Sequence, residues 1–179
     1  IRHKLEDLTK EIIKYKNYFG TKGGVTISGG EPLMQIDFVI ELLKSVKSYG
    51  IHTAVDTSGF TFNADNEESV RKHQELIKYV DLFLLDIKHI DDDMHRVITG
   101  HPNSNILDLA KYLSDIDKDV WIRHVLVPTR SDNDEALKRL NSFIETTNRF
   151  FCWNKTCISW DKHGWRSNLS SSTRWWKRS

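Results

Sequence analysis

The chain has 179 residues, of which 39% are hydrophobic and 28% are charged, a composition typical of a globular protein that buries a core. It contains no apolar run long enough for a transmembrane helix and no signal-peptide or transit-peptide pattern. Its two cysteines are too few for a disulfide framework and indicate a reducing compartment. We therefore expect a cytoplasmic protein without a membrane partner.

The amino-acid composition and net charge of the chain change near residue 148. Residues 1–148 contain 19 basic and 24 acidic residues, whereas residues 149–179 contain seven basic residues, one acidic residue, five of the six tryptophans and both cysteines. Ile158 and Leu169 alone represent the aliphatic residues of the second part, too few to offset the entropy of ordering it. We interpret residues 1–148 as one folded domain and residues 149–179 as a basic, tryptophan-rich tail outside the packed core.

Hydrophobic periodicity predicts alternating helices and strands in the first part. Leu5, Leu8 and Ile12, for example, are spaced by three or four residues, which is typical of an amphipathic helix. Glycines follow at the predicted helix end. In chain order we predict helix 2–19, strand 25–27, helix 37–49, strand 51–55, helix 66–79, strand 80–85, helix 106–114, strand 120–127 and helix 134–145.

Strands that alternate with helices form a parallel sheet with right-handed crossovers. An open doubly wound sheet and a complete or partial (β/α) barrel both fit this order. Each predicted strand delivers an unusual polar group near its carboxyl end, as in a barrel, whereas a doubly wound sheet concentrates its site at one switch point. The fold class that we predict is therefore α/β, a partial (β/α) barrel of parallel strands.

The first candidate segment is Gly29-Gly30-Glu31, which follows the predicted strand 25–27. Two glycines let the backbone approach a ligand closely, and the adjacent carboxylate is able to bind an ammonium group. A plain turn with an acidic residue before a helix is the alternative. The segment is not a nucleotide-binding fingerprint, because the G-x-G-x-x-G spacing is absent.

Polar residues of the next three strands extend the candidate site. The segment Asp56-Thr57-Ser58-Gly59 forms either an N-cap and turn or a set of oxygen ligands for a cation. Asp86 and Lys88 share one strand face, where they form an ion pair, bind an anion or provide a Schiff-base lysine. Arg123 lies in an apolar run, where an unpaired charge is costly, so we expect it to have a partner in a salt bridge.

The histidines and cysteines do not form a recognisable metal site. His89, His95 and His101 lack a ligand spacing, and we expect them on the surface or in loops. Cys152 and Cys157 lie outside the predicted barrel and have no second pair.

Five segments occur in a specific order within residues 1–148. They are VTISGGEP (25–32), DTSGF (56–60), DLFLLDIK (81–88), HRVITG (95–100) and WIRHVLVP (121–128). Together they resemble the radical S-adenosylmethionine (SAM) superfamily and, within it, the pyruvate formate-lyase-activating enzymes. Gly-Gly-Glu alone indicates only the superfamily, whereas the combination is specific for the narrower family.

The resemblance implies a partial (β/α) barrel and a [4Fe–4S] cluster held by three cysteines. In the family the cluster reduces SAM to methionine and a 5′-deoxyadenosyl radical. The radical takes a hydrogen atom from a glycine of the partner, a glycyl-radical enzyme, here pyruvate formate-lyase. An electron donor such as flavodoxin or ferredoxin is implied as well.

The resemblance also assigns roles to residues of this chain. Residues after the first predicted strand would hold the methionine amino group of SAM, those after the third would contact its methionine end, and two on the fourth strand would lie near the cofactor. The residues implied to bind the cofactor are Gly29, Gly30, Glu31, Asp86, Lys88, Arg123 and Val125. The residues implied to form a monovalent-cation site are Asp56, Thr57 and Asp86.

The chain departs from the family in two places. The Cys-x-x-x-Cys-x-x-Cys loop of the family is absent, so we expect a fragment that lacks the cluster ligands and is inactive by itself. After residue 148 the sequence also differs, and both a shifted reading frame and a genuine basic tail remain open.

Two functions from other classes are alternatives. One is a barrel lyase that uses Lys88 as a Schiff-base nucleophile, although no separate acid–base pair is evident. The other is a binding module whose basic, tryptophan-rich tail stacks on single-stranded nucleic acid. The tail has no known RNA-binding signature, which makes nucleic acid the less favoured partner.

Overall fold

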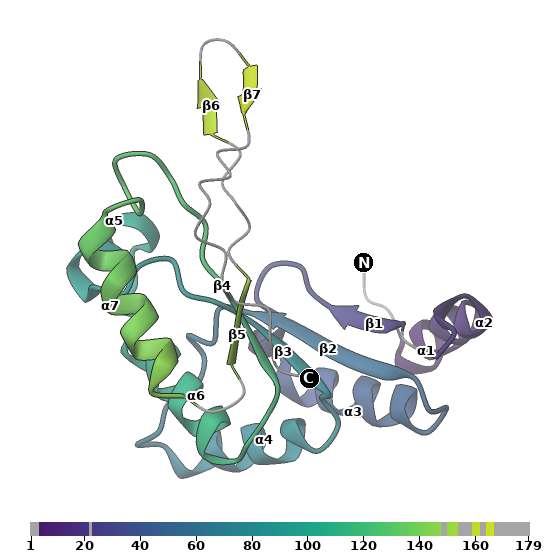
Figure 1. Ribbon diagram of the computed structural model, residues 1–179. Coiled ribbons are helices and arrows are strands. Elements are labelled where there is room, and N and C mark those ends of the chain that lie inside the picture. The colour runs from purple at the N-terminus through teal and green to yellow at the C-terminus, as the bar shows by residue number, and fades with distance from the viewer. Residues whose placement is uncertain (1–3, 22, 148–149, 154–158, 162–163, 167–179) are drawn as a thin grey trace.

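The computed structural model describes residues 4–21, 23–147, 150–153, 159–161 and 164–166. Five parallel strands form one sheet, and their order in the sheet is their order in the chain (Figure 1). This sequential order confirms the predicted partial barrel, because a doubly wound sheet reverses direction at its switch point. The strands are β1 (Gly24–Ile27), β2 (His52–Thr57), β3 (Leu82–Asp86), β4 (Val120–Arg123) and β5 (Phe150–Trp153).

Helices connect the strands and cover one side of the sheet (Figure 1). A separate two-stranded antiparallel sheet is formed by β6 (Ser159–Asp161) and β7 (Gly164–Arg166). The helices are α1 (Leu5–Lys14), α2 (Lys16–Phe19), the 3-10 helix η1 (Pro32–Gln35), α3 (Ile36–Lys47), α4 (Glu67–Ile77), α5 (Asp92–Thr99), α6 (Ser104–Asp115) and α7 (Asp134–Glu145).

The core lies between the sheet and these helices. Phe83 and Leu85 of β3 and Ile122 of β4 point towards the helices and are completely buried. Because successive side chains of a strand point to opposite faces, the alternate residues Asp86 and Arg123, which are register partners, lie on the open face. Because the apolar residues of β3 and β4 pack against the helices, the polar residues at the ends of these strands lie on the opposite face of the sheet.

The amphipathic first helix is confirmed, with a different boundary. Leu5, Leu8 and Ile12 pack against a small second cluster of buried residues, which are Leu42 and Val46 of α3 and Ile51 before β2. The predicted helix 2–19 is divided at Tyr15 into α1 and α2. Apolar spacing thus identified the buried face of the helix but not the break in its backbone.

Several other expectations need correction. Of the three histidines expected on the surface or in loops, His101 is exposed and His89 lies in a loop although it is buried, whereas His95 is buried within helix α5. The fourth strand ends at Arg123, so Val125 lies in the following loop. Helix α5, which was not predicted, contains His95.

The backbone of residues 150–153 forms β5 and pairs with β4, although the sequence placed these residues in the tail. The side chains of residues 148–179 lie outside the described part of the chain. The expectation that the tail lies outside the packed core therefore stays a prediction. Among the described residues, no helix is both long and apolar enough to span a membrane.

Candidate functional site

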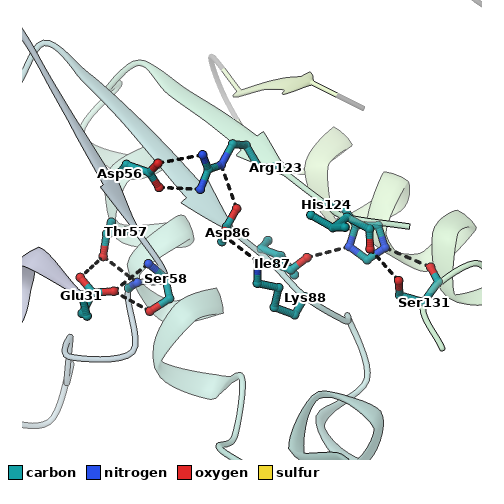
Figure 2. A network of polar contacts seen from close by, with 12 residues as sticks. Glu31, Asp56, Thr57, Ser58, Asp86, Ile87, Lys88, Arg123, His124 and Ser131 are labelled. Atoms are coloured by element: carbon teal, nitrogen blue, oxygen red, sulfur yellow. Dashed lines mark hydrogen bonds and ion pairs between the residues drawn. The ribbon is translucent and has the colours of Figure 1, made fainter. Parts of the chain in front are cut away.

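The carboxyl ends of the parallel strands bring the predicted polar residues to one edge of the sheet (Figure 2). The glycine pair and its neighbouring acid follow β1, and the other polar residues lie at or just after the ends of β2, β3 and β4. The residues that the structure gathers at this edge are Gly29, Gly30, Glu31, Asp56, Thr57, Asp86, Lys88, Arg123 and Val125.

Arg123 connects two of the strand-end acids. Its Nη1 and Nη2 donate to Oδ2 and Oδ1 of Asp56 at 2.8 and 2.5 Å, and its Nε donates to Oδ1 of Asp86 at 2.8 Å. Burial lowers the pKa of Arg123, but the hydrogen bonds and negative charges of Asp86 and Asp56 outweigh burial and raise this pKa above its ordinary value. The expectation that Arg123 has salt-bridge partners is confirmed.

Lys88 extends this network through the other oxygen of the same acid. Its Nζ donates to Oδ2 of Asp86 at 2.9 Å, and the side chain is 37% exposed. A Schiff-base lysine needs a neutral amine, which burial away from acids favours. The setting of Lys88 therefore suits recognition of an anionic group better than nucleophilic attack.

Glu31 links the loop after β1 to the loop after β2. Its Oε1 accepts from Thr57 Oγ1 at 2.5 Å and from the Leu33 amide at 3.1 Å. Its Oε2 accepts from the amide and the hydroxyl of Ser58 at 2.8 and 2.6 Å. Four hydrogen bonds thus fix the carboxylate beside the glycine pair, and Ser58, which belongs to the candidate segment 56–59, donates two of them.

Gly29 and Gly30 leave open space beside this carboxylate. Their φ angles are +97° and +55°, values that favour glycine, and a Cβ added to either residue would meet no other atom within 4 Å. Both residues are exposed. The strand end therefore leaves space for a ligand to approach the backbone next to a fixed negative charge.

The predicted monovalent-cation site has a different arrangement in the structure. The guanidinium of Arg123 bridges Asp56 and Asp86, and the hydroxyl of Thr57 is bonded to Glu31. Over the part of the chain that the structure describes, no group of three or more histidines, cysteines, aspartates or glutamates is placed to hold a metal ion. A cation bound by these three residues stays a prediction.

Sequence reasoning missed His124 and Ser131. Both are buried, and Nδ1 and Nε2 of His124 lie 2.6 and 3.2 Å from the carbonyl oxygens of Ile87 and Ser131 (Figure 2). A signal was available, because alternation places His124 on the same buried face as Ile122. A polar side chain on that face requires hydrogen-bond partners.

A separate hollow of about 290 Å³ lies beside the first turns of α4. His73 and Thr61 line it, and within the described residues His73 Nε2 and Thr61 Oγ1 are buried without a hydrogen-bond partner. Nδ1 of His73 contacts the Ser69 carbonyl at 2.8 Å. Burial lowers the pKa of His73, against the smaller opposing effects of the Ser69 carbonyl and the charge of Glu31.

Comparison with known proteins assigns the fold to one family. The family model described as the radical SAM superfamily matches residues 2–140. A pyruvate formate-lyase-activating enzyme of Streptococcus mutans is 47% identical over 140 residues, which cover 78% of this chain and 53% of that protein. The enzyme of the same name from Staphylococcus epidermidis is 50% identical over 143 residues, which cover 79% of this chain and 57% of that protein. The chain thus spans about half the length of these relatives.

Solved structures agree with this assignment. A domain of pyruvate-formate lyase-activating enzyme from Bacteroides vulgatus has a TM-score of 0.62 and 31% identity, covering 71% of this chain and 74% of that domain. Streptococcus suis SuiB bound to S-adenosylmethionine has a TM-score of 0.64 and 22% identity, covering 84% of this chain and 33% of that protein. The second likeness concerns the fold alone.

Proposed function

The chain belongs to the radical SAM superfamily, and from this premise we propose that its strand-end residues bind SAM in the activation of a glycyl-radical enzyme. Relatives at 47 and 50% identity are named pyruvate formate-lyase-activating enzymes, which favours pyruvate formate-lyase as the partner. A flavodoxin or ferredoxin as electron donor and a cytoplasmic location complete the proposal.

The charge of the strand-end site is the observation that carries this proposal. Glu31, Asp56 and Asp86 supply three negative charges, and Lys88 and Arg123 supply two positive charges. The site therefore has a net charge of −1 at neutral pH. SAM carries a sulfonium, an ammonium and a carboxylate group, a net charge of +1, so the ligand and the site are complementary.

The residues fit the separate groups of SAM as well. Glu31 stands beside the open backbone of Gly29 and Gly30, where an ammonium group finds a fixed carboxylate. The partly exposed ammonium of Lys88 is available to a carboxylate. Arg123 keeps Asp56 and Asp86 in place. In the family, SAM bound at a reduced cluster supplies the radical that takes hydrogen from the glycine of the partner.

The residues of this chain do not fit the [4Fe–4S] cluster. Such clusters are held by cysteine thiolates, and the family uses three, whereas this sequence has two, Cys152 and Cys157. The backbone of Cys152 pairs with Ile122 at the far strand of the sheet. Cys157 lies outside the described residues. We therefore assign SAM binding to these residues and no step that passes through the cluster.

Isothermal titration calorimetry with SAM and S-adenosylhomocysteine tests the proposal. The second ligand lacks the sulfonium charge, so we expect weaker binding than for SAM, with a difference that shrinks at high salt. Lys88→Met should weaken SAM binding by about tenfold, since it removes one charged hydrogen-bond donor. Lys111→Met, at an exposed lysine of α6, is the matched control. No binding of SAM, or equal binding of the two ligands, would contradict the proposal.

A further inference from the structure

His124 is a buried polar side chain that the proposed binding of SAM does not use. It follows the last residue of β4 and is 3% exposed. Strand alternation places it on the face opposite Arg123. In Figure 2 its ring lies between the backbone of Ile87 and that of Ser131. Its ring nitrogens therefore face backbone carbonyl oxygens and not the charged side chains of the site.

The contact between His124 and Ile87 is the shorter of two. Nδ1 lies 2.6 Å from the Ile87 carbonyl oxygen, and Nε2 lies 3.2 Å from the Ser131 carbonyl oxygen. A carbonyl oxygen only accepts hydrogen bonds, so the short contact requires a hydrogen on Nδ1. The longer Nε2 contact is a hydrogen bond only when Nε2 carries a hydrogen as well. The inference therefore depends on the Ile87 contact.

Ile87 is the residue between Asp86 and Lys88, just beyond the end of β3. Its amide donates to the Arg123 carbonyl at 3.0 Å, and its carbonyl accepts from His124. Two consecutive residues at the end of β4 thus hold both backbone polar groups of Ile87. Since a buried carbonyl without a partner is costly, His124 fixes the backbone from which Asp86 and Lys88 project.

The loop that carries Val125 passes beside the same histidine. Ser131 Oγ donates to the Val125 carbonyl at 2.6 Å and accepts from the Val127 amide at 2.8 Å. Thr129 in this loop has a φ of +65°, which a β-branched residue adopts only where surrounding contacts impose it. Ser131 closes the loop, and its carbonyl faces His124.

We propose that His124 is a positioning residue of the SAM site, whose Nδ1–H holds the Ile87 carbonyl and thereby sets Asp86 and Lys88 relative to Arg123. This inference rests on the proposed binding of SAM. It adds a residue that touches neither the ligand nor the charged groups.

Three variants separate the two contacts of the ring. His124→Asn keeps an amide donor near the place of Nδ1, whereas His124→Gln puts its donor near the place of Nε2. His124→Phe keeps most of the volume and removes both ring nitrogens. Leu113→Ala, at a fully buried residue of α6, is a control for lost stability without a change at the strand ends.

Calorimetry with SAM and hydrogen–deuterium exchange of residues 84–91 test the inference together. We expect His124→Asn to keep SAM affinity within about threefold, and the Gln and Phe variants to lose about tenfold, the equivalent of about 1.4 kcal/mol. Exchange at residues 84–91 should accelerate in the Gln and Phe variants only. Leu113→Ala should lower the unfolding temperature and change neither readout.

Two results would overturn the positioning role. One is a His124→Phe variant with unchanged exchange at residues 84–91, and the other is an Asn variant that loses as much affinity as Phe. If the unmodified chain does not bind SAM, the proposed function fails by that result. The exchange comparison still decides whether His124 positions the end of β3.

Discussion

At the scale of single residues, Gly30 combines backbone conformation with open space. Its φ of +55° costs any other residue energy, and no atom lies within 4 Å of an added Cβ. Gly50, in the turn between α3 and β2, shares both properties with a φ of +70°. Of Gly30 and Gly50, Gly30 alone stands beside the strand-end acids. A comparison of these two glycines therefore separates the cost of backbone strain from the loss of ligand space.

We predict that Gly30→Val abolishes SAM binding while much of the fold remains. Both Gly30→Val and Gly50→Val should lose stability, by about 1–2 kcal/mol for the left-handed backbone, as measured by urea unfolding. Calorimetry should show unchanged SAM affinity for Gly50→Val. Unchanged affinity in Gly30→Val would remove the assigned role, and equal losses in the two variants would attribute the effect to strain.

At the scale of elements, the sequence predicted the bounds of a helix or strand correctly where neighbouring residues determine them. Helix α7 has the predicted bounds, and the Asn133 side chain caps it by accepting from the amides of Glu135 and Ala136. Strand β4 is shorter than predicted, because Ser131, a later residue, engages the backbone of Val125 and Val127.

Helix α5 was missed because it is short. It has only eight residues, so the helical spacing of Met94, Val97 and Ile98 extends over too few turns for periodicity alone to identify a helix. In the same way, the order of the strands predicted which site residues gather at one edge. It did not predict that Arg123 bridges two acids or that Glu31 binds Ser58, because partners across strands depend on the register and the loops.

Helix α4 carries a titratable group whose burial makes stability depend on pH. Burial lowers the pKa of His73 from 6.5, so the unfolded chain takes up a proton at a higher pH than the folded chain. The contribution of neutral His73 to the free energy of unfolding is fully present above pH 6.5. It decreases as the pH falls towards the lowered pKa, by at most about 1.4 kcal/mol per pH unit.

We predict that His73→Phe removes this part of the pH dependence. Urea unfolding at several pH values from neutral down to mildly acidic should show a smaller loss of stability in the variant than in the unmodified chain. Leu76→Ala, at a completely buried residue of the same helix, should lose stability equally at each pH. A His73→Phe variant that keeps the full slope would assign the titration to another group.

At the scale of the whole molecule, the described chain is an open sheet of five parallel strands with its charged site along one edge. It spans 53 and 57% of two relatives named pyruvate formate-lyase-activating enzymes. The division into a domain of residues 1–148 and a tail of residues 149–179 stays a prediction, and pairing of β5 with β4 extends the sheet past that boundary. Binding of SAM and its reductive cleavage are therefore separate questions for this chain.

We predict that the chain as written binds SAM but does not cleave it reductively. Electron delivery requires a low-potential cluster on cysteine thiolates, and the family's cluster uses three, leaving one iron for the amino and carboxylate groups of SAM. Cys152 and Cys157 provide two. After anaerobic reconstitution with iron and sulfide, and addition of dithionite and SAM, we expect no stable four-iron signal and no 5′-deoxyadenosine. The Streptococcus mutans relative, treated identically, is the positive control. Stoichiometric 5′-deoxyadenosine from this chain would show that its cluster ligands have been misidentified.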